Sequence, residues 1–253
     1  MLILAGLAMV AAATGYWWYR ASGAPRLVAD TLCPEKGPSG VVVVLLDRSD
    51  PLTIQQREGL RNRLMGLRDG LSQHERLDVY AVGDTTTTLR DPVVSLCNPG
   101  KGDDANVWTS NPRLMRQRWE KRFADRIDSA LADVLMVDTA ESQSPVMESL
   151  QSVAITALGR IPAETPRRLV IVSDMIQHTR EYSQYRGVGN FESFRSTPYF
   201  ERMSCDLGGA EVTILYLNRA PVSAVQGKAH IAFWRDYIAA MNGQLVSVVR
   251  IEG

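Results

Sequence analysis

The sequence has few of the residues and motifs that mark the commonest functional classes. Only three histidines and three cysteines occur among its 253 residues, and none of them has the spacing of a zinc site. The chain also lacks a GxxxxGK[ST] loop and a Gly-x-Gly-x-x-Gly turn. It therefore carries no positive signal for zinc or for a nucleotide.

An excess of basic charge is also missing. The chain has 28 Lys and Arg residues against 28 Asp and Glu residues, whereas a surface that binds nucleic acid usually shows a basic excess or patch. The arginine-rich stretches at 113–122 and 166–168 are better interpreted as a solvated helix face and the start of a strand. We therefore expect no nucleic-acid partner.

The first segment departs from globular composition. Residues 2–19 carry no charge, and Trp17, Trp18 and Tyr19 form an aromatic edge next to Arg20. This length suits a spanning helix, and aromatic residues favour the membrane interface. A cleaved signal peptide would need a basic start, which is absent. A buried N-terminal helix would need a polar face. We predict a single-pass anchor at 1–20 in the inner (cell) membrane, followed by a linker at 21–40.

The side of the membrane that the rest of the chain faces is left open by the sequence. Arg20, Arg26 and Lys36 follow the predicted anchor, which favours a cytoplasmic body. Cys33 and Cys97 lie in turn-like contexts where a disulfide could form, which weakly favours an oxidising, periplasmic compartment. Unpaired thiols are the alternative.

Beyond the linker, predicted strands alternate with predicted helices. Strands are predicted at 41–46, 77–82, 85–96, 169–173, 211–217 and 245–249, and helices at 54–71, 113–134, 145–158 and 229–241. The predicted helix at 113–134 carries one apolar stripe, made of Trp119, Phe123, Ile127 and Leu131. The unbroken apolar run Val41–Leu46 is typical of a central parallel strand covered on both faces. The alternation predicts one α/β domain at 41–253, with a doubly wound, mostly parallel sheet and helices on both faces.

Acidic and hydroxyl side chains follow two of these strands. Asp47 and Ser49 come directly after the first strand, Asp174 follows the strand at 169–173, and Ser144 stands at a helix start. Ligands of open parallel sheets lie beyond the carboxyl ends of the strands. Carboxylate and hydroxyl oxygens suit Mg²⁺ or Mn²⁺.

This pattern resembles von Willebrand factor A-like (vWA) domains, whose metal-ion-dependent adhesion site reads Asp-x-Ser-x-Ser after the first strand. Asp47 and Ser49 match that motif, Ser144 resembles its later Thr, and Asp174 resembles its Asp after the fourth strand. Pro51 departs from the motif, because it stands where the second Ser would be. The resemblance implies a bound Mg²⁺ with one open coordination position for an acidic side chain of a partner protein.

Simpler interpretations exist for the same residues. Asp47 and Ser49 are good helix caps, and Ser144 followed by Pro145 reads as a helix N-cap with proline at the first helical position. A Ser/His/Asp triad that includes His178 has no support in the sequence.

Three functions follow, and we expect the first: a membrane-tethered, non-enzymatic protein-binding module. The second is a Mg²⁺-dependent phosphoryl-transfer or hydrolytic enzyme. The third, which Pro51 favours, is a metal-free structural subunit of a membrane assembly. The polar and aromatic segment 182–195 is either a partner surface or a loop that packs its own aromatic residues, and in both cases Phe191 and Phe194 should be partly buried.

Overall fold

A six-stranded sheet forms the centre of the molecule. Residues 13–16, 25–82, 91–102, 111–136 and 140–253 are described by a computed structural model of the chain. The strands are β1 (Gly40–Asp47), β2 (Glu75–Val82), β3 (Val94–Cys97), β4 (Arg167–Ser173), β5 (Glu211–Leu217) and β6 (Gln244–Ile251). Their order is β3-β2-β1-β4-β5-β6, and all neighbours run parallel except β2 and β3. The predicted α/β class with a mostly parallel sheet is confirmed.

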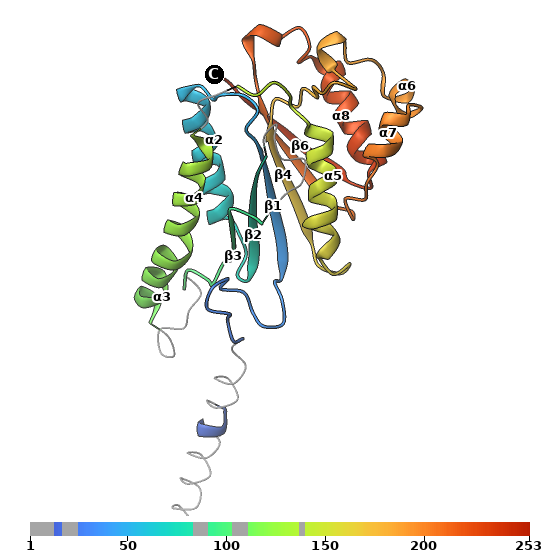
Figure 1. Cartoon of the computed structure of the whole chain (residues 1–253). Coiled ribbons are helices and arrows are strands. Elements are labelled where there is room, and N and C mark those ends of the chain that lie inside the picture. The colour runs from blue at the N-terminus through green and yellow to red at the C-terminus, as the bar shows by residue number, and fades with distance from the viewer. Residues whose placement is uncertain (1–12, 17–24, 83–90, 103–110, 137–139) are drawn as a thin grey trace, which may run out of the picture.

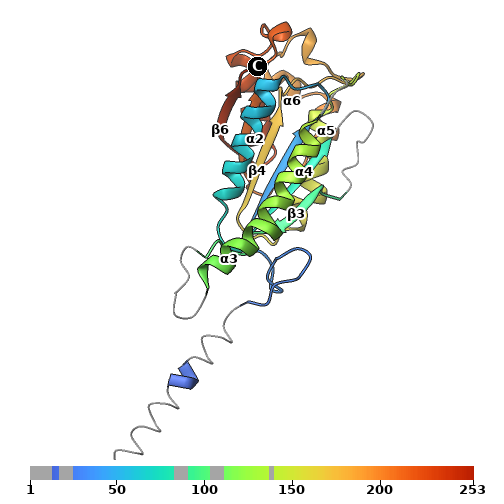
Figure 2. The same ribbon diagram turned by 90° about the vertical axis from the view of Figure 1, so that its left-hand side faces the viewer.

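Helices cover both faces of this sheet. One face carries α2 (Ile54–Asp69), α3 (Pro112–Trp119) and α4 (Asp125–Leu135). The other carries α5 (Val146–Thr156), α6 (Phe191–Arg195), α7 (Pro198–Met203) and α8 (Lys228–Ala240). Figures 1 and 2 show the two helical layers with the sheet between them. The predicted three-layer arrangement is therefore present.

Strand β1 is central because its side chains enter two separate cores. Val41, Val43 and Leu45 belong to the core under α5–α8, and Val42, Val44 and Leu46 belong to the core under α2 and α4. None of these six side chains is more than 1% exposed. Asp47, the first polar residue of β1, lies at the carboxyl end of this strand.

The predicted helix at 113–134 is interrupted. A π-helical turn at Glu120–Ala124 separates α3 from α4. The apolar stripe was nevertheless assigned correctly, because Trp119, Phe123, Ile127 and Leu131 are all buried. A π-turn adds a residue to one turn, which adjusts the direction of the stripe without breaking the helical path.

The start of α5 corrects a sequence prediction. Pro145 is the N-cap and the helix begins at Val146, so the prediction that Ser144 caps this helix is wrong. Ser144 instead exchanges two backbone hydrogen bonds with His178, of 2.8 and 2.9 Å. This bridge joins the loop before α5 to the loop after β4. The hydroxyl of Ser144 is therefore used elsewhere.

The predicted insert at 182–195 packs its own aromatic side chains. Phe191 and Phe194 are buried, which confirms the expectation for both, and their rings contact Phe233 of α8 at centroid distances of 5.8 and 5.2 Å. Aromatic pairs at such distances stabilise a fold beyond the area that they bury. The insert is thus an ordered part of the α6–α8 layer.

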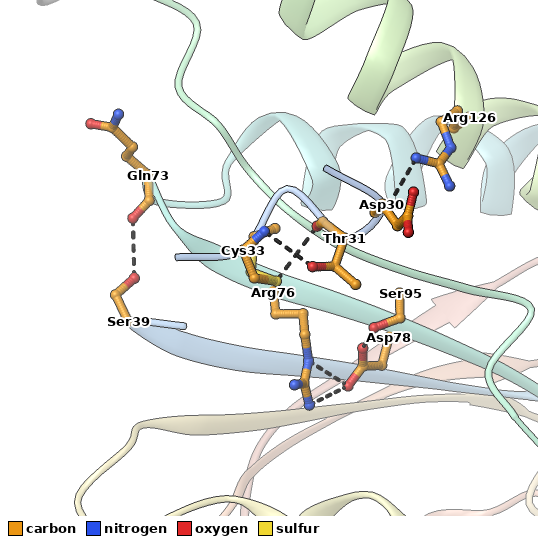
Figure 3. Close-up of a disulfide and its surroundings, with 10 residues drawn as sticks. Asp30, Thr31, Cys33, Ser39, Gln73, Arg76, Asp78, Ser95 and Arg126 are labelled. Carbon is orange, nitrogen blue, oxygen red and sulfur yellow. Dashed lines mark hydrogen bonds and ion pairs between the residues drawn. A yellow bond between two sulfur atoms is a disulfide. The ribbon is translucent and has the colours of Figure 1, made fainter. Parts of the chain in front are cut away.

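Cys33 and Cys97 form a disulfide, which decides between the two alternatives that the sequence left open. Figure 3 shows Cys33 and its surroundings in the segment before β1. Cys97 ends β3 and pairs with Arg76 near the start of β2, so the bond is at the end of the sheet opposite the carboxyl end of β1. The same segment is also held by Arg126, whose guanidinium donates to the carbonyl of Asp30 at 3.1 Å. Residues 27–34 are thereby fixed against the domain.

No helix within the described residues has the length and apolar character needed to span a bilayer. The predicted anchor at 1–20 lies outside the described residues except for 13–16. It stays a prediction.

Candidate functional site

Three separate segments of the chain meet at the carboxyl edge of the sheet, next to the end of β1 (Figure 1). Strands β1 and β4 are parallel neighbours with Leu46 opposite Val172, so the residues that follow them are adjacent. The hydroxyl of Ser173 donates to Asp47 Oδ2 at 2.8 Å, and the hydroxyl of Ser144 donates to the same oxygen at 3.2 Å. The predicted pair Asp47 and Ser144 is therefore in direct contact.

Asp47 organises the loop that follows it. Its Oδ1 accepts a hydrogen bond of 2.9 Å from the backbone N–H of Ser49. The carbonyl of Ser49 accepts in turn from the N–H of Glu141 at 2.7 Å, which ties this loop to the one that carries Ser144. Helix α2 is capped by Thr53 in a capping box with Gln56, so neither Asp47 nor Ser49 caps it.

Asp174 is the second carboxyl group of the site, and it is only 4% exposed. Its pKa is raised to about 7, chiefly by burial and next by the negative charge of Asp47, and the N–H of Ile176 and the charge of Arg219 offset part of that rise. The N–H of Ile176 donates to Asp174 Oδ1 at 2.8 Å. The charge of Asp47 therefore acts on the carboxyl group of Asp174.

The structure adds a cation that the sequence analysis missed. Arg219 follows β5, and its Nε lies 3.6 Å from Asp174 Oδ2. Its Nη1 donates to the carbonyl of Pro51 at 2.6 Å. The signal was present in the sequence, because Arg219 comes two residues after a strand whose carboxyl end shares this edge.

An exposed aromatic side chain lies beside these acidic groups. Tyr185 is 47% exposed, and its ring makes an edge contact with His178 at a centroid distance of 5.1 Å. Burial raises the pKa of Tyr185, and the charges of Asp174 and Asp50 raise it further. The segment 182–195 therefore contributes one residue to the rim of the acidic edge.

The residues present fit a divalent cation in their chemistry. The site joins two carboxylates with serine hydroxyls, which are ligands that Mg²⁺ and Mn²⁺ accept. Within the described part of the chain, no three His, Cys, Asp or Glu side chains are grouped for a metal, so the hydroxyls of Ser49 and Ser144 would have to complete the set. Pro51 offers no hydroxyl, and Arg219 would have to move aside.

Comparisons with known proteins give a likeness of fold alone. No protein-family model matches the chain, and no curated protein matches it. The SpRpn10 VWA domain is 11% identical over 84% of this chain and 88% of that chain, with a TM-score of 0.40. The PilB minor pilin from Streptococcus sanguinis is 12% identical over 87% and 58%, with a TM-score of 0.48. Proximal thread matrix protein 1 from the mussel byssus is 10% identical over 81% and 48%, with a TM-score of 0.43.

This chain thus spans about half of the last two proteins. Identities of this size carry no information about a shared ligand or partner.

Proposed function

We propose that this chain is a vWA-like, non-catalytic protein-binding module that engages its partner through the carboxyl edge of the sheet. The observation that carries the proposal is the contact of Asp47 with Ser144 and with Ser173, from three separate segments, next to the buried carboxylate of Asp174. The exposed ring of Tyr185 beside them adds the kind of side chain that is enriched in protein interfaces.

A divalent cation is the second part of this proposal. Asp47, Ser49, Ser144 and Asp174 would hold Mg²⁺ or Mn²⁺, and the ion would supply a positive charge and an open position for a carboxylate of the partner. The hydrogen bonds from Ser49 and Ser173 to Asp47 hold its carboxylate in one orientation without the ion. The chain thereby prepares the edge for its ligand.

We predict that Mn²⁺ gives a saturable binding signal with the full chain in mild detergent, measured by calorimetry. Asp47→Ala should abolish the signal, because it removes the carboxylate that three groups orient. Asp236→Ala is the matched control, since Asp236 is an exposed aspartate of α8. Absence of heat from the wild-type protein would remove the metal from the proposal and favour the metal-free structural subunit.

The same two variants can be used to find a partner protein. Proteins recovered with the intact chain from membranes in mild detergent should be retained by Asp236→Ala and lost from Asp47→Ala. Equal recovery with both variants would show that the partner binds elsewhere.

We also propose that residues 1–20 tether the domain to a membrane and that the domain faces an oxidising compartment. The disulfide between Cys33 and Cys97 supports this side, because disulfides persist in oxidising compartments. The positive residues after the predicted anchor favour the cytoplasmic side, but the disulfide outweighs them because it requires an oxidising compartment.

Counting free thiols tests the compartment. The denatured chain, taken from membranes with its thiols trapped, should react with maleimide once before reduction and three times after it. Cys205 is the free thiol, and the other two sulfurs are bonded to each other. Three labels before reduction would place the domain in a reducing compartment.

A further inference from the structure

The residue that departs from the adhesion-site motif, Pro51, contacts an arginine in this structure. Pro51 stands where the motif has its second hydroxyl, and the guanidinium of Arg219 donates to the carbonyl of Pro51 at 2.6 Å. The same guanidinium lies 3.6 Å from Asp174, a carboxylate that the motif assigns to the metal. One guanidinium therefore contacts both the residue without a hydroxyl and the carboxylate that the motif assigns to the metal.

Arg219 is held in place by a buried amide. The side chain of Gln226 is 5% exposed, and its Oε1 accepts from the backbone N–H of Arg219 at 2.7 Å. Its Nε2 donates to the carbonyls of Asp174 at 3.2 Å and Leu217 at 2.8 Å. One side chain thus fixes the backbone of Arg219 to the backbone of Asp174.

The contact between Arg219 and Asp174 brings a positive charge to an acidic edge. Asp47 and Asp174 are coupled carboxylates, and Asp50 also acts on Asp174. A buried carboxylate without a counter-charge is costly, and a bound divalent ion is one way to supply that charge. The side chain of Arg219 is only 17% exposed, so water and salt screen its charge only weakly.

We infer that Arg219 is the resident cation of this edge and competes with a divalent metal ion for Asp174. The inference deepens the proposed function, and its metal arm rests on that proposal. Arg219 offsets part of the negative charge that Asp47, Asp50 and Asp174 bring to this edge. A metal ion can coordinate the carboxylate of Asp174 only when the guanidinium of Arg219 has moved away from it.

The test is the affinity of the full chain for Mn²⁺, measured by calorimetry in mild detergent. Arg219→Gln should bind Mn²⁺ at least about tenfold more tightly than the wild type, because the competing charge is gone. Arg219→Lys should stay within about threefold of the wild type, because its charge remains. Arg250→Gln is the matched control, since Arg250 lies at the same edge and contacts Asn218. Equal affinities of wild type and Arg219→Gln would overturn the inference and leave the metal proposal standing.

A second measurement separates the two claims if no variant binds Mn²⁺. In EDTA, Arg219→Gln should melt at a lower temperature than the wild type. The same substitution added to Asp174→Asn should change the melting temperature little. That coupling would uphold Arg219 as the resident cation while the metal proposal fails. Additive losses in the double variant would overturn the inference, whatever the metal does.

Discussion

Removal of the bond between Cys33 and Cys97 should lower the free energy of unfolding by about 4 kcal/mol, the largest stability effect that we expect. The bond joins residues 64 positions apart. Cross-linking a loop of that length restricts the unfolded chain, and the entropic gain grows with loop length. The bond also fixes the end of β3, an edge strand of only four residues.

The measurement is chemical denaturation of Cys33→Ala combined with Cys97→Ala. Wild-type protein in reductant should fall to the stability of this double variant. Cys205→Ala is the control, because Cys205 is a half-buried free thiol, and it should change the unfolding free energy by no more than about 1 kcal/mol. A loss below about 1 kcal/mol in the double variant would mean that the local hydrogen bonds hold the segment without the disulfide.

Lowering the pH from 7.5 to 5 should remove about 2 kcal/mol of the stability that depends on His230. The side chain is fully buried, and burial lowers its pKa from 6.5 to about 4. Its Nε2 lies 3.1 Å from the carbonyl of Met175 and accepts from the indole N–H of Trp234 at 3.0 Å, and its Nδ1 lies 2.6 Å from the Tyr216 hydroxyl.

The direction follows from the two states. Between pH 6.5 and 4 the unfolded chain binds a proton at His230 and the folded chain does not, so stability falls as the pH falls. Gln184 and Trp234 are the other groups that contact the ring, and neither carries charge. Asp174 acts in the opposite direction, because its pKa is raised and the folded state binds its proton more tightly.

The comparison is therefore between the wild type and His230→Gln, not between two pH values of the wild type alone. The stability difference between these two proteins should shrink by about 2 kcal/mol from pH 7.5 to 5 in denaturation experiments. Gln55→Ala, at an exposed position of α2, should keep the wild-type pH profile. An unchanged difference between wild type and His230→Gln would show that folding does not lower the pKa of His230.

Strands whose pattern was unbroken were predicted almost to the residue. Glu211–Leu217 was predicted with the bounds that it has, and β1 extends only one residue beyond Val41–Leu46 at each end. Local periodicity suffices there, because a run of β-branched and aliphatic residues that is buried on both faces has no competing helical arrangement. The stripe through α3 and α4 was visible for the same reason.

Helix starts were less predictable. Ser144 has the residue type of an N-cap, but its backbone pairs with His178, a residue 34 positions away. Cap preferences describe what a local segment favours, and a long-range bridge overrides them when it satisfies the same backbone groups. The antiparallel direction of β3 was hidden for a similar reason, since strand direction depends on the partner.

The residues of the candidate site were likewise only partly predictable from the sequence. Asp47 and Asp174 could be named from the sequence, because each follows a strand and parallel strands end at one edge. Arg219, Gln226 and Ser173 entered only with the structure. Their roles depend on contacts between loops, and no local pattern encodes those contacts.

By itself the sequence determined the layered α/β architecture and the edge at which acidic residues collect. Periodic burial and strand ends are local properties, so they can be read along the chain. Only the tertiary structure decided that Cys33 bonds to Cys97 and that Arg219 reaches Asp174. Both pairings join segments that are distant in sequence, and the packing of the intervening chain selects which side chains meet.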